Sequence, residues 1–393
     1  MAEPIPVVDA LHAVLERITG PLPSEQVSLA EAAGRVLAST PEARLDLPPF
    51  PSSAMDGFAG RAEDTPGRFP VAGHVAAGRP SQHPLAAGEA MGIATGGVVP
   101  EGADAVVQIE RVTVDGETVD IPDRLEPGTN IRYAGRDVAK GAPFLGAGRR
   151  IGPAQVGALA AAGHAEVECA RRPRVALLST GTELRKPGEE LRAGDIYESN
   201  GPMLRTLFTA VGAEVALLDS VADDEAAHRE AIEQGLDHDV LVTSGGVSVG
   251  PHDLVRRIEA ELGVEEVFWG VSVRPGKPLA FGVRGRTLVF GLPGNPVSSL
   301  VCSILFVLPA LRKLQGEEPG PHYEQGALSQ PYQPDSRRDE LVRARLIGDG
   351  LLQPLPAQES HMIVWAASAD ALVYVPSGPD ALPAGTPVRY LHL

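Results

Sequence analysis

The stretch DVLVTSGGVSVGPHD, residues 239–253, decides the fold of this chain. It begins with a run of β-prone apolar residues and passes directly into the paired glycines Gly245 and Gly246. Pro251 and Asp253 then open a segment with helical periodicity, where a proline is tolerated in the first turn. A buried strand that turns through glycines into a helix predicts a parallel α/β sheet, whose ligands lie at the carboxyl ends of its strands.

The same alternation of strand and helix extends on both sides of this stretch. The expected strands are 174–180, 214–220, 239–244 and 286–293, and the expected helices are 200–212, 224–235, 251–263 and 295–314. Strands that alternate with helices predict a doubly wound parallel sheet. We assign this domain to residues 173–315 and expect Asn200 to cap its first helix.

Two β domains are expected beside this sheet. Residues 42–142 are rich in glycine and proline, and RVTVDGETVDI at 111–121 predicts a hairpin, so a small β domain is expected there. Residues 320–393 contain short strand-like runs after a linker rich in proline and glycine. They predict a small C-terminal β barrel or sandwich.

The remaining segments, 1–41 and 143–172, carry helical patterns and predict a helical linker domain. Ser28 and Glu31 form a capping box that predicts a second helix near the N-terminus. The helix expected at 151–163 would return to pack with the N-terminal helices. The small β domain is therefore expected to be an insertion between the two halves of this linker domain.

Composition indicates a soluble, acidic protein of several domains. The 393 residues exceed what one core usually organises, and the formal net charge is −17. This charge argues against general binding to nucleic acid or anionic membranes, which needs broad basic surfaces. Cys169 and Cys302 form no CxxC pair, which argues against a disulfide framework or a thiolate zinc site. The N-terminus is unlike a signal peptide and the longest apolar run is shorter than a membrane span, so a cytoplasmic location is expected.

Three glycine-containing loops follow expected strands, at the edge where α/β sheets bind ligands. Glycines let backbone N–H groups approach a phosphate, and the N-terminus of the next helix adds partial positive charge. A tight turn without a ligand is the alternative for any one loop, but three loops at one edge favour an anion site. The candidate residues are Ser179, Thr180, Gly181 and Thr182; Ser244, Gly245, Gly246, Ser248 and Gly250; and Pro293, Asn295 and Pro296.

Charged residues accompany these loops. Glu183 and Asp253 each lie just beyond a glycine-rich loop, and carboxylates beside a phosphate site indicate a divalent cation such as Mg²⁺. An ordinary first-turn acid is the alternative for Asp253. Arg274 and Lys277 flank a corner stiffened by prolines and predict a clamp for an anionic substrate, the alternative being a solvated turn.

The inserted β domain has polar candidates of its own. Asp56 lies in a stretch too rich in glycine and proline for a core strand, and Thr95 lies in a second glycine loop. Arg132 and Asp137 lie in a short charged segment. For each of them the alternative is a hairpin tip with solvated side chains.

Together these motifs resemble one family, the molybdopterin molybdenumtransferases, which are also similar to the C-terminal domain of gephyrin. The resemblance runs through essentially the whole chain. It rests on PPFPSSAMDGFA, ATGGVVPEGADAVVQIE, NIRYAGRDV, LLSTGTEL, IYESNGPML, TSGGVSVGPHD, RPGKPLAFG and GLPGNPVS, in this order.

The resemblance implies a molybdopterin-binding type of sheet domain and an elongated homodimer, whose active site lies between that domain of one subunit and the inserted domain of the other. It implies Mg²⁺-dependent insertion of molybdenum from molybdate into adenylylated molybdopterin, with release of AMP, as the final step of molybdenum cofactor biosynthesis. A molybdopterin adenylyltransferase and maturation factors of molybdoenzymes are the further partners implied.

The resemblance also assigns roles to the candidates. Glu183 and Asp253 become the metal ligands, and with Asp56, Thr95 and Asp137 they form the catalytic set. Arg132, Arg274, Lys277, Arg338 and Ser360 join the loop residues in binding substrate. The sequence departs from the family at Arg274, where a lysine is common, and at Gly270, Leu341 and Glu359.

Two other functions stay open. One is a molybdopterin adenylyltransferase, which shares the doubly wound fold but lacks the flanking domains. The other is a non-catalytic pterin carrier or an assembly scaffold, against which the retained Glu183, Asp253 and Lys277 argue.

Overall fold

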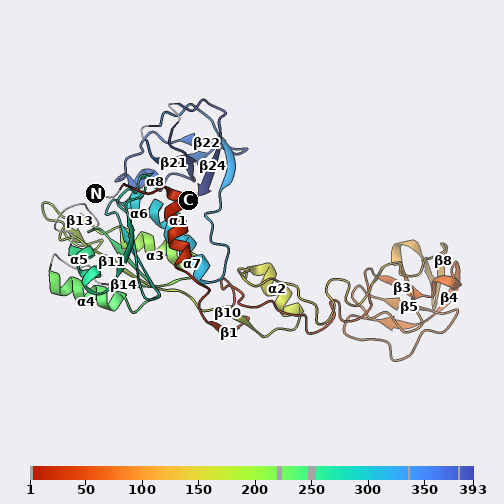
Figure 1. The fold of residues 1–393 in the computed structure, drawn as a ribbon. Helices are drawn as coiled ribbons and strands as arrows, with labels where there is room; N and C mark the ends of the chain where they lie inside the picture. The colour runs from red at the N-terminus through yellow and green to blue at the C-terminus, as the bar shows by residue number, and fades with distance from the viewer. Residues whose placement is uncertain (1–2, 219–223, 247–253, 335–336, 379–380) are drawn as a thin grey trace.

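The computed structural model describes residues 3–218, 224–246, 254–334, 337–378 and 381–393. The molecule is elongated (Figure 1). An α/β body lies beside a C-terminal β barrel, and a thin ribbon connects the body to a β unit at the far end of the molecule. This architecture confirms the predicted combination of a doubly wound domain with additional β structure.

The body is built on a six-stranded sheet with the order β14-β11-β15-β19-β18-β16. The first four strands are parallel. β18 runs antiparallel to them, and β16, antiparallel to β18, runs in the same direction as the first four. The strands are β14 (Glu214–Leu217), β11 (Arg174–Ser179), β15 (Val240–Ser244), β19 (Thr287–Leu292), β18 (Ala280–Arg284) and β16 (Glu265–Trp269). Ser179 pairs with Ser244 and Ser244 with Leu292, so three strands end together at one edge.

Helices cover both faces of this sheet because alternate strand residues point to opposite sides. Val175, Leu177 and Val242 join a core with α1 (Val7–Glu16), α3 (Asn200–Ala210), α6 (Pro296–Cys302) and α7 (Leu308–Leu314). Ala176, Leu178 and Leu241 join the core with α4 (Glu225–Gly235) and α5 (Leu254–Glu261) on the other face. A π-helical turn, Ser303–Val307, connects α6 to α7.

In the described part of the chain, one helix is long and apolar enough to cross a membrane, at residues 296–314. It is 83% buried over its most apolar window, as expected of a core helix in the body.

The expected helical linker domain is largely a β ribbon. β1 (Ser24–Ser28) pairs antiparallel with β10 (Glu166–Ala170), and α2 (Pro153–Ala161) contributes to their common core. The predicted second helix is wrong: Ser28 does donate a 2.8 Å hydrogen bond to Glu31, but the chain turns there and Gly34 has φ +77°. The expected packing of the N-terminal helix with α2 is also wrong, because α1 packs on α7 and the π-helical turn of the body.

The β unit at the far end contains a six-stranded sheet, β6-β3-β5-β4-β8-β7, and a short strand pair, β2 with β9. The predicted hairpin is confirmed as β7 (Thr113–Asp115) and β8 (Thr118–Ile121), with Gly116 at φ +61° in the turn. The remaining strands are β2 (Ser52–Ser53), β3 (Gly57–Gly60), β4 (Gly67–Val75), β5 (Ala90–Ile93), β6 (Ala105–Gln108) and β9 (Ile131–Arg132).

The C-terminal region is a closed five-stranded barrel, in which β21 pairs with both β22 and β23 and the ring continues through β20 and β24. Its strands are β20 (Glu324–Leu328), β21 (Asp339–Leu346), β22 (Leu351–Pro354), β23 (Ala371–Val375) and β24 (Pro387–His392), with α8 (Ile363–Ala366) outside the ring. β17 (Val273–Arg274) of the body pairs in parallel with β21 and joins the barrel to the body.

Candidate active site

A cavity of about 1310 Å³ lies at the carboxyl edge of the body sheet and is closed on one side by the barrel. Such a position is where open α/β sheets bind ligands. Fourteen of the residues predicted from the sequence line it: Ser179, Thr180, Gly181, Glu183, Ser244, Gly245, Gly246, Arg274, Lys277, Pro293, Asn295, Pro296, Arg338 and Ser360.

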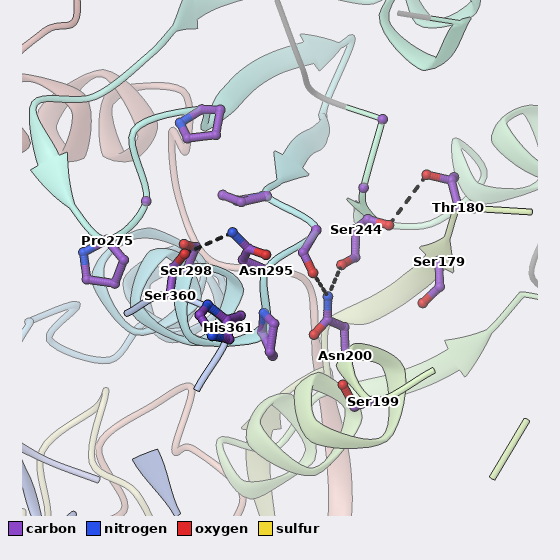
Figure 2. Close-up of a pocket in the computed structure, with 18 of the residues that line it drawn as sticks. Ser179, Thr180, Ser199, Asn200, Ser244, Pro275, Asn295, Ser298, Ser360 and His361 are labelled. Carbon is purple, nitrogen blue, oxygen red and sulfur yellow. Dashed lines mark hydrogen bonds between the residues drawn. The ribbon is translucent and has the colours of Figure 1, made fainter. Parts of the chain in front are cut away.

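Asn200 joins the ends of two neighbouring strands at the floor of this cavity. Its side-chain amide donates to the hydroxyl of Ser244 and to the carbonyl of Gly294, both at 2.8 Å (Figure 2). Asn200 is the first residue of α3 and its side chain makes no cap, so the predicted capping role is wrong. Its amide instead holds the loops after β15 and β19 in place.

Gly245 lies where two of the loops touch. Its φ is +95°, and a Cβ there would come within 2.7 Å of the carbonyl oxygen of Thr180. Thr180 in turn donates its backbone N–H to the carbonyl of Ser244 at 3.0 Å. The missing side chain at Gly245 is therefore explained by packing between loops, in addition to any approach by a ligand.

The barrel contributes the loop that carries Ser360. Asn295 donates its amide to the Ser360 hydroxyl at 2.8 Å, and the N–H of Val297, in the first turn of α6, donates to the Ser360 carbonyl at 3.1 Å (Figure 2). Since Val297 uses one of the first N–H groups of α6, the barrel loop is docked at the start of that helix.

Arg343 was not predicted as a site residue, and it organises the same loop from β21, on the strand face opposite Val342 and Ala344 of the barrel core. Arg343 is 1% exposed and donates to the carbonyls of Ala357 and Glu359 at 2.8 and 3.1 Å. Burial lowers the pKa of Arg343, partly offset by the charge of Glu359. The position of an arginine in a barrel strand carries no sequence signal that would reveal this contact.

Among the described residues, the carboxylates that line the cavity are Glu359 on the barrel loop and two glutamates of the body, Glu183 and Glu198. Glu183 is exposed, and Glu198 is half-buried where its Oε1 accepts hydrogen bonds from the Ser179 hydroxyl at 3.1 Å and the Gly201 N–H at 2.7 Å. Glu198 was not predicted, although it lies in the IYESNGPML motif. Within the described ranges, no group of three His, Cys, Asp or Glu side chains could hold a metal ion.

The cations lie on the opposite wall, where β17 meets the barrel. Arg274 and Lys277 line the cavity, and Arg274 donates to the carboxylate of Glu340 at 3.2 Å. Glu340 is 3% exposed and also accepts a 2.8 Å hydrogen bond from the Tyr332 hydroxyl. The Arg274 guanidinium is thus held by a buried acid of the barrel, and Arg338 reaches the Val273 carbonyl at 3.4 Å beside it.

Four predicted residues lie elsewhere. Asp56, Thr95, Arg132 and Asp137 belong to the β unit and its connection to the ribbon, far along the molecule from this cavity (Figure 1). Asp56 and Thr95 are close together, because the Thr95 N–H donates to Asp56 Oδ1 at 2.7 Å. One chain therefore does not bring these residues to the cavity of its own body.

The remaining predictions divide into two groups. Thr182 follows Gly181 in an exposed loop but is not among the residues that line the cavity. Ser248, Gly250 and Asp253 lie outside the described residues. Their assignment stays a prediction.

Comparison with known families matches the chain in three segments. The MoeA N-terminal region (domain I and II) matches residues 5–163, a probable molybdopterin binding domain matches 176–313, and the MoeA C-terminal region (domain IV) matches 325–393.

Curated relatives and solved structures agree with these matches. The chain is 38% identical over 309 residues to a molybdopterin molybdenumtransferase of Haemophilus influenzae, covering 78% of this chain and 76% of that protein. It is 37% identical over 386 residues to molybdopterin molybdenumtransferase 2 of Mycobacterium tuberculosis, covering 93% and 94%. The molybdopterin biosynthesis MoeA protein of Pyrococcus horikosii, a solved structure, is similar with a TM-score of 0.83 at 32% identity over 99% of both chains.

Proposed function

Because this chain belongs to the molybdopterin molybdenumtransferase family, and is thus an enzyme that transfers molybdenum in cofactor biosynthesis, we propose the substrates of that transfer. The acceptor is adenylylated molybdopterin and the metal donor is molybdate. AMP is released as molybdenum enters, in the final step of the pathway.

The observation that carries this proposal is the arrangement of the cavity. Three loops at the ends of β11, β15 and β19 meet there, and Arg274 and Lys277 face them from the wall next to the barrel. A pyrophosphate suits glycine-rich loops and helix N-termini, and a tetrahedral dianion suits fixed cations and hydroxyl groups. In a molecule of net charge −17 such a local set of donors favours an anionic substrate.

The chain contributes mainly position and electrostatic stabilisation to this reaction. The dithiolene sulfurs that take up the metal belong to the substrate, so the cavity needs no cysteine, and Cys302 is fully buried behind Gly276. Arg274 and Lys277 hold anionic oxygens, and Asn200 keeps two loops at a fixed separation. Fixed geometry of this kind contributes several kcal/mol to a barrier reduction.

The acids of the cavity fit Mg²⁺. Glu183 and Glu198 present carboxylate oxygens, which are the hard ligands that Mg²⁺ prefers, and we assign Asp253 as a further acid from the sequence. When bound, the ion would neutralise phosphate charge. This role distinguishes Glu183 from an ordinary surface acid.

We also propose that two copies of the chain form the working enzyme in the cytoplasm. The β unit and its connection to the ribbon lie far from the cavity of their own chain (Figure 1), so a second copy would supply the four residues that they carry, Asp56, Thr95, Arg132 and Asp137. The domain boundaries proposed from the sequence suit this arrangement, with residues 42–142 as the part that is exchanged between active sites. The adenylyltransferase that makes the substrate and the maturation factors that receive the product are the proposed protein partners.

One assay tests the function. Purified protein is incubated with adenylylated molybdopterin, Mg²⁺ and micromolar molybdate, and AMP is measured. AMP release that depends on molybdate supports the proposal. Consumption of ATP with free molybdopterin would indicate an adenylyltransferase instead, and neither reaction would indicate a carrier or scaffold.

A further inference from the structure

A second cavity, of about 580 Å³, lies on the barrel next to the candidate active site. It is formed between the strands β21 and β22, the loop before β21 and the helix α8. Gln358 lines both cavities, so the two are separated by the loop that carries Ser360. Its volume is in the range of sites for small molecules.

Aromatic and proline side chains line this second cavity. Trp365 and Tyr332 line it together with three prolines. Tyr332 is fixed by two hydrogen bonds, from its hydroxyl to Glu340 and from its N–H to the carbonyl of Leu382, both at 2.8 Å. Trp365 is 39% exposed, so part of this side chain is accessible from outside the fold. Rigid aromatic side chains and prolines are suited to stacking against a planar ring.

Amide groups line the edge of the same cavity. The Gln358 side chain is locked by bonds to Arg343 and Leu355, and the Gln330 amide donates to the Pro354 carbonyl at 3.2 Å. Gln353 is exposed at the cavity. The N–H groups of the Gln358 amide are used in these bonds, so the exposed amide of Gln353 presents the donor and acceptor that match the alternating N–H, C=O and ring nitrogen groups of a heteroaromatic edge.

Arg345 adds a positive charge. It is exposed, lines the cavity, and is oriented by a hydrogen bond from its Nε to the Ser368 carbonyl at 3.3 Å. A guanidinium fixed through Nε presents its terminal N–H groups to an oxyanion. The set of an aromatic wall, amides and one arginine therefore selects a planar heteroaromatic ring that carries an anionic group.

We propose that this second cavity binds the pterin ring of the cofactor, as a site distinct from the one at which molybdenum is inserted. The choice of a pterin rests on the proposed function. The Tyr332–Glu340–Arg274 chain of hydrogen bonds connects a wall of the second cavity to a cation of the first. A ring that binds against Tyr332 is thereby coupled to the active site.

The two tryptophans of the chain allow binding at the two cavities to be distinguished by fluorescence. Trp269 lines the first cavity and Trp365 lines the second. Trp269→Phe leaves Trp365 as the sole indole reporter, and Trp365→Leu leaves Trp269. Each variant is titrated with pterin-6-carboxylate, with fluorescence and calorimetry recorded together. Inorganic phosphate serves as the control for binding of an anion without a ring.

We expect saturable quenching in Trp269→Phe that Arg345→Gln weakens about tenfold, since it removes a charge-assisted contact. Arg284→Gln, an equal loss of charge at the exposed end of β18, leaves the affinity unchanged. Circular dichroism confirms that each variant is folded. Gln353→Leu is a second binding variant, which removes an amide and keeps the aromatic wall. Adenylylated molybdopterin, added before and after molybdate, shows whether substrate or product supplies the ring.

The proposal is overturned if Arg345→Gln and Gln353→Leu bind pterin-6-carboxylate as tightly as the parent protein. It is also overturned if the ligand quenches only Trp269, or if it does not bind. These outcomes are separate from failure of the proposed function. A wild-type protein without molybdate-dependent AMP release can still quench through Trp365, and an active enzyme can lack that quenching.

Discussion

The side-chain amide of Asn295 donates a 2.8 Å hydrogen bond to the hydroxyl of Ser360 and so joins the sheet loop to the barrel across the candidate active site. These residues are 65 positions apart in the chain and belong to different structural units. The cavity is therefore a shared property of the body and the barrel, and its shape depends on contacts between them.

We expect Asn295→Ala and Ser360→Ala each to lower kcat/KM for AMP release about tenfold, because a hydrogen bond that fixes a site contributes about 1–1.5 kcal/mol. The double variant should be no worse than either single variant, since both remove one contact. Ser368→Ala, which removes only the bond from the Ser368 hydroxyl to the Val364 carbonyl in α8, is the control. Independent, additive losses would show that the contact does not act as a unit.

Substitutions of Glu183 and Glu198 should have different effects on activity and stability, although both residues line the cavity. Glu183→Gln is expected to reduce Mg²⁺-dependent AMP release about 100-fold while the protein stays folded, because it removes a proposed metal ligand. Glu198→Ala should in addition lower stability by about 1–3 kcal/mol, since the Gly201 N–H at the start of α3 loses its acceptor.

Activity measured against Mg²⁺ concentration, with thermal unfolding of the same samples, separates the two effects. An unchanged requirement for Mg²⁺ in Glu183→Gln would remove this residue from the metal site.

Arg150 fixes the ribbon to the body. It donates to the carbonyls of Gly34 and Val211 at 2.7 and 3.0 Å and forms a two-pronged pair with Glu317. Arg150→Met should widen the distribution of molecular dimensions in small-angle X-ray scattering and lower kcat/KM severalfold. Arg68→Met, which removes an exposed ion pair with Asp115 inside the β unit, should change neither quantity. Identical scattering from the Arg150 variant and the wild type would contradict this role.

Asp239 should make the body less stable at acid pH than at neutral pH. Burial alone would raise the pKa of Asp239, but its hydrogen bonds from the Arg171 guanidinium and the Arg174 N–H outweigh burial and hold that pKa below the ordinary 3.8. A carboxyl whose pKa is lowered by folding stabilises the protein above the unfolded pKa, and this contribution disappears as the pH falls through the folded pKa.

The measurement is chemical unfolding of the wild type and Asp239→Asn as a function of pH. The wild type should be about 2–3 kcal/mol more stable near neutral pH, and the difference should shrink below about pH 4. A difference that is constant down to pH 2 or so would show that the charge of Asp239 is not what stabilises the fold.

The periodicity of the sequence was sufficient for the body, because β11, β15 and β19 are apolar strands followed by glycine loops and helices. It failed at β1, where SEQVS buries only Val27 and has no apolar alternation to detect. The alanine-rich run after Ser28 has helical propensity, yet bridges from Val36 to Arg150 and from Leu37 to Cys169 take its backbone into the ribbon. Tertiary pairing there overrides local preference.

The site shows the same division. Loop residues of the cavity could be predicted since glycines and charges follow strands in the sequence. The roles of Asn200 and Arg343 could not be predicted, because they depend on hydrogen bonds to residues that are distant in the sequence. The partners are Ser244 and Gly294 for Asn200, and Glu359 for Arg343. Nor could spacing reveal that the β unit, which contains Asp56, would lie far from the body, which contains Glu183.

The length of the ribbon has a genetic consequence. On the proposed two-chain arrangement, a cell that carries one allele damaged at Asp56 and another damaged at Glu183 makes mixed dimers in which one of the two catalytic centres is whole. Such a pair of alleles would complement each other and restore molybdoenzymes, whereas two alleles damaged in the same part of the chain would not.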